Sequence, residues 1–347
     1  MKWFILYTAI STLILSACED KQSQTKPIIG VTLPETPLRI EDRISFKIND
    51  PSAELLSISV NNTPLSHDEQ YISLRPLALG KHEMVFRLKT QTGEKTEKKS
   101  IAIFASTPPK KWKSELIATY AHNTDYYTQG LEFVGDTLYE STGQKGRSVI
   151  SAYNPFTNQK FTSTALDAAY FGEGITILND RVIQLTWQAR KGFIYERQSL
   201  NKLEEFAYGA SSEGWGLAHD QQHVYKSDGT EFIYKLDPKT LQETDYFTVS
   251  STSAFYKNAN ELEVVDDLLF ANVYQKNSIM IINKLSGALE GVIDLGYLEE
   301  QLTKDSNFDL LNSVLNGIAY HSGRQSFFVT GKNWNLLFEM KFIPSEE

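Results

Sequence analysis

The chain has very little cysteine and no excess of basic residues. Its 347 residues include one Cys, and 34 Lys and Arg against 43 Asp and Glu give a formal net charge of −9. A single cysteine excludes a disulfide within the chain, so packing must stabilise the fold. The acidic balance and the absence of a basic stripe argue against a nucleic-acid partner, because such proteins concentrate Lys and Arg against phosphates.

Several catalytic motifs are also missing. The sequence contains no Walker loop and no Gly-x-Ser-x-Gly, and its 6 His residues show no HExxH or comparable ligand spacing. With no spare cysteine to complete a ligand set, a catalytic zinc is not expected. We therefore predict chemistry that requires no metal and no cofactor.

The N-terminus carries an apolar run that is short for a membrane-spanning helix. Lys2 precedes this run, which covers residues 3–15 and reads as a secretory signal. The run ends in Leu-Ser-Ala-Cys, which resembles the lipobox of bacterial lipoproteins, with Cys18 as the lipidated residue. We predict that residues 1–18 are a signal peptide and that the exported protein is anchored to the membrane of the bacterial cell envelope through Cys18. A core cysteine is the alternative.

The region after the signal divides into a tether, a small domain and a linker. Residues 19–26 are polar and without periodicity, which is typical of a flexible tether. Residues 27–105 hold short alternating strands separated by turn residues, which predicts an immunoglobulin-like β-sandwich with a spacer or stacking role. Residues 106–111 contain Pro108-Pro109, which predicts a stiff linker.

Residues 112–347 contain five related pairs of apolar segments. The leading segments begin at Gln129, Glu173, Trp215, Asn260 and Asn316, at intervals of 44, 42, 45 and 56 residues. Each pair straddles a turn signal, and units of about 40 to 50 residues are typical of four-stranded propeller blades. We predict an all-β chain, a five-bladed β-propeller preceded by the sandwich. Apolar residues near helical spacing predict a helical insertion at about 297–314, which lengthens the last interval.

The hairpins also predict a shared cavity. An antiparallel hairpin brings the first residue of the leading segment beside the end of the returning segment. Radial repetition then gathers these ends around one mouth. The returning segments end at Gly143, Trp187, Gly229, Tyr274 and Lys332. A purely structural ring does not require such different side chains at equivalent positions, so we predict that this mouth is the binding site.

Two charged and two amide side chains at these positions are candidates for chemistry. Glu173, beside tryptophans in a partly dehydrated mouth, is expected to carry protons near neutral pH, whereas an ion pair with Lys332 is the alternative. Lys332 is the only cation among the ring positions and is suited to an oxyanion, unless it is a solvated surface lysine. Gln129 and Asn260 offer amide groups for a substrate amide or amine, or they cap strand ends.

Aromatic side chains are predicted to form a wall of the same mouth. Trp187, Trp215 and Tyr274 occupy ring positions, and Trp334 lies near Lys332 in the sequence. The alternative is that these rings pack in the core.

Eight short motifs in the second domain resemble one enzyme family. They are Tyr-Thr-Gln-Gly-Leu at 127–131, Glu-Ser-Thr-Gly at 140–143, Phe-Gly-Glu-Gly-Ile at 171–175, Gln-Leu-Thr-Trp at 184–187, Gly-Trp-Gly-Leu at 214–217, Asn-Glu-Leu-Glu at 260–263, Leu-Asn-Gly-Ile-Ala at 315–319 and Val-Thr-Gly-Lys at 329–332. Together and in this order they resemble the plant and bacterial type of glutaminyl-peptide cyclotransferase, a family of five-bladed propellers. The resemblance implies conversion of the N-terminal glutamine of a peptide or protein into pyroglutamate, with release of ammonia.

The resemblance also implies residue roles. It makes Glu173 the proton-transferring acid and base, with Lys332, Gln129 and Asn260 holding the polar groups of the substrate. Trp187 and Trp215 would then shape the pocket.

The chain departs from the family pattern at two positions. Tyr274 stands where the family commonly has Trp, and Asn335 stands where Pro usually follows Lys-x-Trp.

Two other functions remain open from the sequence. The first is a non-catalytic propeller that binds peptides or glycans at the same aromatic mouth. The second is an assembly scaffold in which the sandwich domain supplies the active surface.

Overall fold

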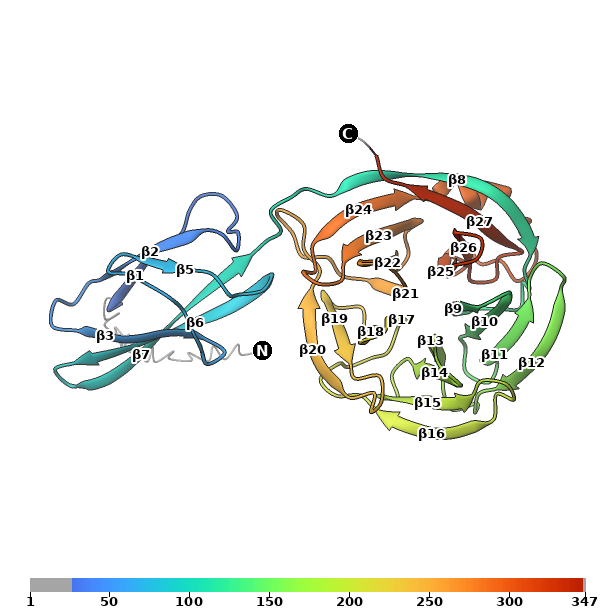
Figure 1. The fold of residues 1–347 in the computed structure, drawn as a ribbon, viewed down its shortest axis with the longest axis horizontal. Coiled ribbons are helices and arrows are strands. Elements are labelled where there is room, and N and C mark those ends of the chain that lie inside the picture. The colour runs from blue at the N-terminus through green and yellow to red at the C-terminus, as the bar shows by residue number, and fades with distance from the viewer. Residues whose placement is uncertain (1–26, 346–347) are drawn as a thin grey trace, which may run out of the picture.

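The computed structural model describes residues 27–345, and these residues form an all-β molecule with two parts (Figure 1). Strands β1 to β7 make the smaller part, and β8 to β27 make a ring of sheets beside it. The predicted all-β class is confirmed. The predicted signal peptide, lipobox and tether, residues 1–26, lie outside the described residues.

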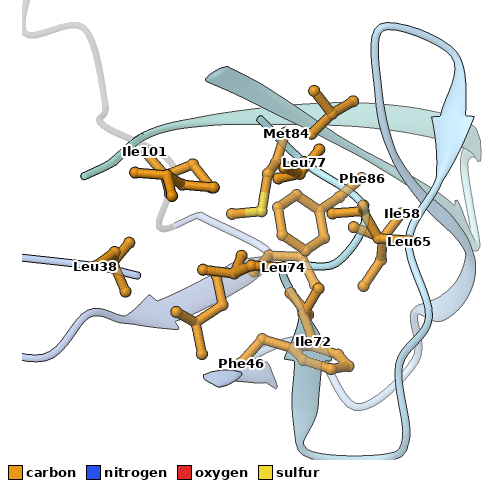
Figure 2. Packing of buried hydrophobic residues seen from close by; sticks show 14 of the residues in the cluster. Leu38, Phe46, Ile58, Leu65, Ile72, Leu74, Leu77, Met84, Phe86 and Ile101 are labelled. Atoms are coloured by element: carbon orange, nitrogen blue, oxygen red, sulfur yellow. The ribbon is translucent and has the colours of Figure 1, made fainter. Parts of the chain in front are cut away.

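The smaller part consists of two sheets that share one core. One sheet holds β1 (Ile29–Thr32), β2 (Arg43–Ile48) and β5 (Tyr71–Ser73), and the other holds β3 (Glu54–Val60), β4 (Thr63–Pro64), β6 (Gly80–Thr90) and β7 (Gly93–Ile103). Phe46 from the first sheet and Ile58, Met84 and Phe86 from the second meet in a buried cluster (Figure 2). Burial alternates along β2, as expected of a strand that covers a core on one face only.

The ring contains five sets of four strands. The first three sets are β9 (Thr128–Val134), β10 (Thr137–Thr142), β11 (Val149–Asn154) and β12 (Gln159–Ala165); β13 (Gly172–Leu178), β14 (Arg181–Thr186), β15 (Lys191–Glu196) and β16 (Lys202–Ala207); and β17 (Leu217–His219), β18 (Val224–Ser227), β19 (Phe232–Leu236) and β20 (Glu243–Thr248). The other two are β21 (Ala259–Val265), β22 (Leu268–Val273), β23 (Ser278–Asn283) and β24 (Leu289–Asp294); and β25 (Leu315–His321), β26 (Ser326–Gly331), β27 (Leu336–Ile343) and β8 (Lys110–Ala121).

Each predicted segment pair is the inner hairpin of one set. Strands β9, β13, β17, β21 and β25 lie innermost in the ring, and each pairs antiparallel with the strand that follows it (Figure 1). The expected turns, such as Gly135-Asp136 between β9 and β10, are where the hairpins reverse. Every residue of β13 is buried, whereas most of the outer strand β16 is exposed. The apolar pattern of the inner strands therefore reflects contacts on both of their faces.

Strand β8 joins the two ends of the ring. It pairs antiparallel with β27 and, through Lys110 opposite Gly291, in parallel with β24. The fourth and fifth sets thereby become one eight-stranded sheet. The expected linker, residues 106–111, is shorter than predicted, because β8 begins at Lys110. Lys110 and Lys111 follow the two prolines directly and are already paired with residues of β24.

The helical insertion expected at about 297–314 is mostly not helical. A 3₁₀ helix covers Gly296–Gln301, and turns and irregular chain follow it. The leucine spacing does not mark one buried face, because Leu298 is buried whereas Leu310 and Leu311 are 77% exposed. In addition, the Asp309 side chain accepts a hydrogen bond from the backbone of Leu311 at 2.9 Å, and such local bonds compete with a helix.

The inner strands lie so close together that the residue directly after a leading ring residue must be glycine in most sets. A Cβ on Gly216 would lie 1.9 Å from the carbonyl oxygen of Asn260 on the next inner strand, and one on Gly174 would lie 2.6 Å from that of Trp215. In the fourth set Glu261 takes this position instead. Its carboxylate accepts hydrogen bonds from the backbone of Leu131 at 3.1 Å and of Ile318 at 2.7 Å. Backbone contact therefore holds the inner ends of the sets together.

The two parts touch along one side of the third set. The Phe104 ring stacks on Phe255 with 4.7 Å between centroids, and the Ala105 N–H donates to the Ser251 carbonyl at 3.1 Å. These contacts adjoin the segment after β7, so the smaller part lies outside the ring and away from its centre (Figure 1).

We expect Gly216→Ala to lower the free energy of unfolding of the ring by roughly 2–4 kcal/mol, because the added methyl group meets fixed backbone rather than a movable side chain. Urea unfolding followed by tryptophan fluorescence measures this change, since the tryptophans among the described residues all lie in the ring.

Gly323→Ala is the matched control. Its Cβ would meet only the His321 side chain, at 3.3 Å, so we expect a change below about 1 kcal/mol. Equal midpoints for the wild type and Gly216→Ala would contradict the close approach of the inner strands.

Candidate active site

Four of the five leading ring residues lie at irregularities in the inner strands, and the fifth, Trp215, precedes β17. In β13, Glu173 and Gly174 together face a single residue of β14, because Gly172 pairs with Thr186 and Ile175 with Gln184. The same register shift occurs at Asn260 in β21 and at Asn316 in β25, and a related one leaves Gln129 unpaired in β9. A β-bulge re-aims the side chain that it carries. These bulges, which the sequence pattern did not reveal, turn polar residues toward the centre of the ring.

The returning residues are hydrogen-bonded through the backbone to residues just before the leading residues. The Trp187 N–H donates to the Phe171 carbonyl at 3.1 Å, the Tyr274 N–H to Asn258 at 2.9 Å, and the Lys332 N–H to Val314 at 2.9 Å. Each acceptor lies two residues before a leading ring residue. The two sets of ring positions therefore lie at the same end of each hairpin, as the spacing predicted.

A cavity of about 280 Å³ opens where these ends converge. Its lining residues are Tyr127, Gln129, Phe171, Glu173, Trp187, Trp215, Asn260, Tyr274, Asn312 and Lys332. Seven of the eight side chains proposed from the sequence are among them.

The exception is Trp334. Its side chain is 1% exposed, packs beside Phe338 in the ring core, and donates its indole N–H to the Ser313 carbonyl at 3.0 Å. Gly331 lies against the indole and leaves no room for a Cβ. The prediction that Trp334 belongs to the aromatic wall is therefore wrong. The ring residue Asn316 is also buried outside the cavity lining, where it donates to Gln129 Oε1 at 2.9 Å.

Glu173 and Lys332 are both almost fully buried, with 4% and 3% of their surfaces exposed. Burial raises the pKa of Glu173 well above its ordinary range; Lys332 opposes this rise and Glu213 adds to it. Burial likewise lowers the pKa of Lys332 to about 8, against the effect of Glu173. Within the described residues, no carboxylate oxygen comes within 4.0 Å of Lys332 Nζ, so the alternative of a direct ion pair is not realised.

Aromatic rings hold the Lys332 ammonium in place of a carboxylate. Its Nζ atom lies 4.8 Å from the centroid of Tyr127 and 5.2 Å from that of Tyr274. A cation over an aromatic face is stabilised by the ring quadrupole, more strongly where water is excluded. Lys332 therefore remains close to Glu173 and keeps its N–H groups free for a ligand.

The aromatic side chains continue around the cavity. Tyr274 meets Trp215 edge to face at 5.4 Å, and Phe171 meets Tyr127 at 6.2 Å and Trp187 at 5.6 Å. Such edge-to-face pairs fix ring orientations. Together with Lys332, they form a nearly closed belt.

Glu213 closes this belt, although the sequence had not singled it out. Its Oε2 atom accepts the indole N–H of Trp187 at 2.7 Å and that of Trp215 at 2.8 Å. The buried Lys226 in turn donates to the Glu213 carbonyl at 2.8 Å. One carboxylate thus sets the positions of both tryptophans and adds negative charge near Glu173.

Hydrogen bonds behind Glu173 fix its backbone. Ser141 Oγ donates to the Glu173 carbonyl at 2.5 Å, and Ser141 accepts from Gln184 Nε2 at 2.9 Å. Tyr195 completes the chain by donating to Gln184 at 3.0 Å. A second layer of hydrogen bonds of this kind holds a side chain of a functional site in position.

One polar atom of the cavity lining has no partner. Asn260 Oδ1 is buried and accepts no hydrogen bond within the described residues. A buried acceptor without a donor is costly, and such atoms often await a ligand. This oxygen is suited to a substrate N–H group.

The sequence reasoning missed Tyr127, Phe171, Glu213 and Asn312. Three of them share a signal, because Tyr127, Phe171 and Glu213 each lie two residues before a leading ring residue. Extending the repeat backwards by two positions would have found them. Asn312 lies in the irregular insertion, where no repeat position exists.

Two features are not found within residues 27–345. In this part of the chain, no three His, Cys, Asp or Glu side chains are grouped so as to ligate a metal ion. Nor does any helix between residues 27 and 345 combine the length and apolar character that a bilayer crossing needs. The cavity offers instead an acid–base group, a cation and orienting amides, which together suit proton transfer at a polar carbonyl group.

Comparison with known proteins identifies similar enzymes. A family model described as Glutamine cyclotransferase matches residues 85–342. A glutaminyl-peptide cyclotransferase of Arabidopsis thaliana is 38% identical over 228 residues, which cover 65% of this chain and 70% of that protein. The crystal structure of Myxococcus xanthus glutaminyl cyclase matches with a TM-score of 0.62 and 26% identity, covering 69% of this chain and 100% of that one.

We expect Glu173→Gln to lower the pKa of Lys332 below its value of about 8, because the substitution removes the charge that opposes the effect of burial. The neutral form of the lysine then persists to a lower pH. NMR titration of the lysine side chains measures this shift.

Lys226 provides an internal control. Burial lowers its pKa to about 8 as well, but the carboxylates that act on it are Glu243 and Asp228, so its titration should not change. An unchanged Lys332 titration in Glu173→Gln would mean that the two groups are not electrostatically coupled.

Proposed function

Because the chain belongs to the glutamine cyclotransferase family, we propose that it is a glutaminyl-peptide cyclotransferase, which converts the N-terminal glutamine of a peptide or protein into pyroglutamate and releases ammonia. The observation that carries this function is the placement of Glu173 and Lys332 in one buried cavity. Its volume of about 280 Å³ lies just below the range of ~300–1,000 Å³ for small-molecule sites, which suits one amino-acid residue.

The reaction joins two groups of the same residue. The α-amine nitrogen attacks Cδ of the glutamine side chain, the N–Cδ bond forms, and the bond between Cδ and the amide nitrogen breaks. The attacking amine must be neutral, and its ordinary pKa is ~7.7–8. The departing nitrogen must gain a proton to leave as ammonia. The protein is left to fold the side chain back, move a proton and stabilise the oxyanion.

Glu173 is suited to both proton transfers. As a carboxylate it accepts the proton that the amine loses, and as a carboxylic acid it donates that proton to the leaving nitrogen. A carboxyl group of ordinary pKa would be a weak acid–base catalyst at neutral pH. The burial that raises the pKa of Glu173 therefore favours this role.

Lys332, Asn260 and Gln129 are suited to binding the polar groups of the substrate. The Lys332 ammonium stabilises the oxyanion that develops on the Cδ carbonyl oxygen. The unpartnered Asn260 Oδ1 accepts a hydrogen bond from a substrate N–H, and Gln129 lies beside Glu173. Since the lysine pKa is about 8, its cation is present at the pH at which half of the substrate amines are neutral.

The aromatic belt of Tyr127, Phe171, Trp187, Trp215 and Tyr274 supports the compact conformer that the reaction needs. Its rings line the cavity beside Glu173 and Lys332, and Glu213 accepts a hydrogen bond from both tryptophans. These protein groups account for every proton and charge in the reaction, so we infer that no metal or cofactor takes part.

The finer classification of the fold belongs to the same proposal. The ring is a five-bladed β-propeller, a reading supported by the five sets of four strands and their inner hairpins. Residues 27–105 are an immunoglobulin-like sandwich, a reading supported by the two sheets around one core. An experimental structure with another number of sets, or with a single continuous sheet in either part, would overturn this classification.

A non-catalytic propeller that binds peptides at the same mouth is not favoured. The relatives are enzymes, and the acid–base pair of the cavity has no purpose in binding alone. Tight binding of glutaminyl peptides without release of ammonia would reverse this preference.

We expect Glu173→Gln to reduce kcat for cyclisation of a glutaminyl peptide by about 10²–10⁴-fold, because the amide neither accepts nor donates the transferred proton. The assay follows ammonia release from a peptide with N-terminal glutamine. Binding of the peptide should be retained, since the amide has nearly the same shape.

Glu205→Gln makes the same substitution on the exposed strand β16, far from the cavity lining, and should keep the wild-type rate. An unreduced rate in Glu173→Gln would remove Glu173 from the reaction. Ammonia release by neither the wild type nor any variant would refute the proposed function itself.

We further propose that the protein is exported and held on the membrane of the bacterial cell envelope by lipid on Cys18. The support is the order of the cation, the apolar run and Leu-Ser-Ala-Cys in residues 2–18. Acyl chains on one residue would leave the tether at residues 19–26 to separate the folded part from the lipid surface.

Cys18→Ser should move the protein from the membrane fraction to the soluble or unprocessed fraction of the producing bacterium, because serine takes no thioether-linked lipid. Fractionation and immunoblotting measure this distribution. Ser23→Ala, in the tether, is the control and should leave the protein on the membrane. Equal distributions for the wild type and Cys18→Ser would argue against a lipid anchor.

A further inference from the structure

A second cavity, here called the annexe, adjoins the active cavity. The annexe has a volume of about 170 Å³ and is lined by Tyr127, Gln144, Arg147, Asn307, Asp309, Asn312 and Asn333. It shares Tyr127 and Asn312 with the active cavity. Whereas the active cavity is walled largely by aromatic rings, the annexe is polar.

One wall of the annexe is a turn tied to the strand that carries Glu173. The Arg147 N–H donates to the Gln144 carbonyl at 3.0 Å, and Ser148 Oγ donates to the same carbonyl at 2.9 Å. Ser148 Oγ also accepts the N–H of Gly172, the residue before Glu173, at 3.0 Å. The backbone at Arg147 is thus tied to the strand that carries Glu173, whereas its side chain is exposed.

The opposite wall is tied to the strand end that carries Lys332. The residue after it, Asn333, donates its N–H to the Tyr126 carbonyl at 2.8 Å. In the insertion, Asn307 Nδ2 donates to Asp125 Oδ1 at 3.0 Å. The annexe is therefore bounded by segments that are hydrogen-bonded to the active-site framework.

Arg147 and Asp309 are the charged side chains of the annexe lining, and Arg147 supplies its positive charge. Both oxygens of Asp309 are occupied within its own loop, by the Leu311 N–H at 2.9 Å and by Asn312 Nδ2 at 2.6 Å. Within the described residues, no carboxylate lies within 4.0 Å of the Arg147 guanidinium, and its side chain donates no hydrogen bond. An arginine guanidinium that has no carboxylate partner and donates no hydrogen bond is well suited to binding a carboxylate of a ligand.

We propose that the annexe binds the part of the substrate that follows the N-terminal glutamine and that Arg147 selects a carboxylate there. This inference rests on the proposed function, because a peptide whose first residue fills the active cavity must leave through the mouth. The annexe is the polar continuation of that mouth. The carboxylate is an acidic side chain at the second or third position, or the C-terminus of a very short peptide.

Matched peptides test this selection. Gln-Glu-Ala-Ala-amide and Gln-Ala-Glu-Ala-amide are compared with Gln-Gln-Ala-Ala-amide and Gln-Ala-Gln-Ala-amide, and Gln-Ala with its amide. In each pair whose carboxylate reaches Arg147, we expect the wild type to show about a three- to tenfold lower KM for the peptide with the carboxylate than for its uncharged partner. The kcat values should differ little. The tetrapeptide pairs report a side-chain carboxylate, and the dipeptide pair reports a terminal one.

Arg147→Gln should abolish the preference and leave KM for the uncharged peptides unchanged. Lys145→Gln, which removes an exposed neighbouring charge outside the annexe lining, should keep the preference. Three outcomes would overturn the inference. The wild type could show no preference for acidic peptides, the preference could survive in Arg147→Gln, or Lys145→Gln could remove it to the same extent.

Binding separates this inference from the proposed function. Dissociation constants for the same peptides, measured with Glu173→Gln and with Glu173→Gln combined with Arg147→Gln, do not depend on turnover. Selective binding without ammonia release by the wild type would refute the function and retain the subsite. Ammonia release without selectivity would retain the function and refute the subsite.

Discussion

The structure depends on the close backbone approach of the inner strands at one end of the ring. At this end a glycine in one strand faces the carbonyl oxygen of the next, and no side chain fits between them. Where the fourth set has Glu261 in place of glycine, its carboxylate bonds to two neighbouring inner strands. In strands such as β13 and β21, the residue next to the close contact is displaced by a bulge and is free to turn inward. The site is therefore a direct product of how the ring closes.

Closure also explains the electrostatics of the site. Glu173 and Lys332 come from the second and fifth sets, which are distant in sequence, and both are buried without a direct ion pair. In water near neutral pH, their ordinary pKa values would keep Glu173 as an anion and Lys332 as a cation. In the cavity, burial draws the pKa values toward neutrality, while the rings of Tyr127 and Tyr274 support the ammonium. This environment therefore favours a change in the charge of either group nearer to neutral pH than in water.

Much of this arrangement could be predicted from the spacing of short motifs. The inner hairpins, their turns and the meeting of the two ring positions followed from repeat length and antiparallel pairing. The spacing marks the position of Glu213, two residues before Trp215, but not its role, which depends on two indole groups from different sets. It also misplaced Trp334, since sequence distance from Lys332 does not say on which side of the strand the ring lies. The insertion failed as a helix because its side chains cap its own turns.

The sequence by itself determined the all-β class, the repeat and the identity of the groups that line the mouth, because a strand period and a hairpin turn are local properties. The tertiary structure alone decided the bulges, the bond from one carboxylate to two tryptophans, the unpartnered Asn260 oxygen and the annexe beside Arg147. Each of these depends on the distance between atoms of different sets. That distance is fixed only when β8 joins the two ends of the ring and the inner strands come into contact.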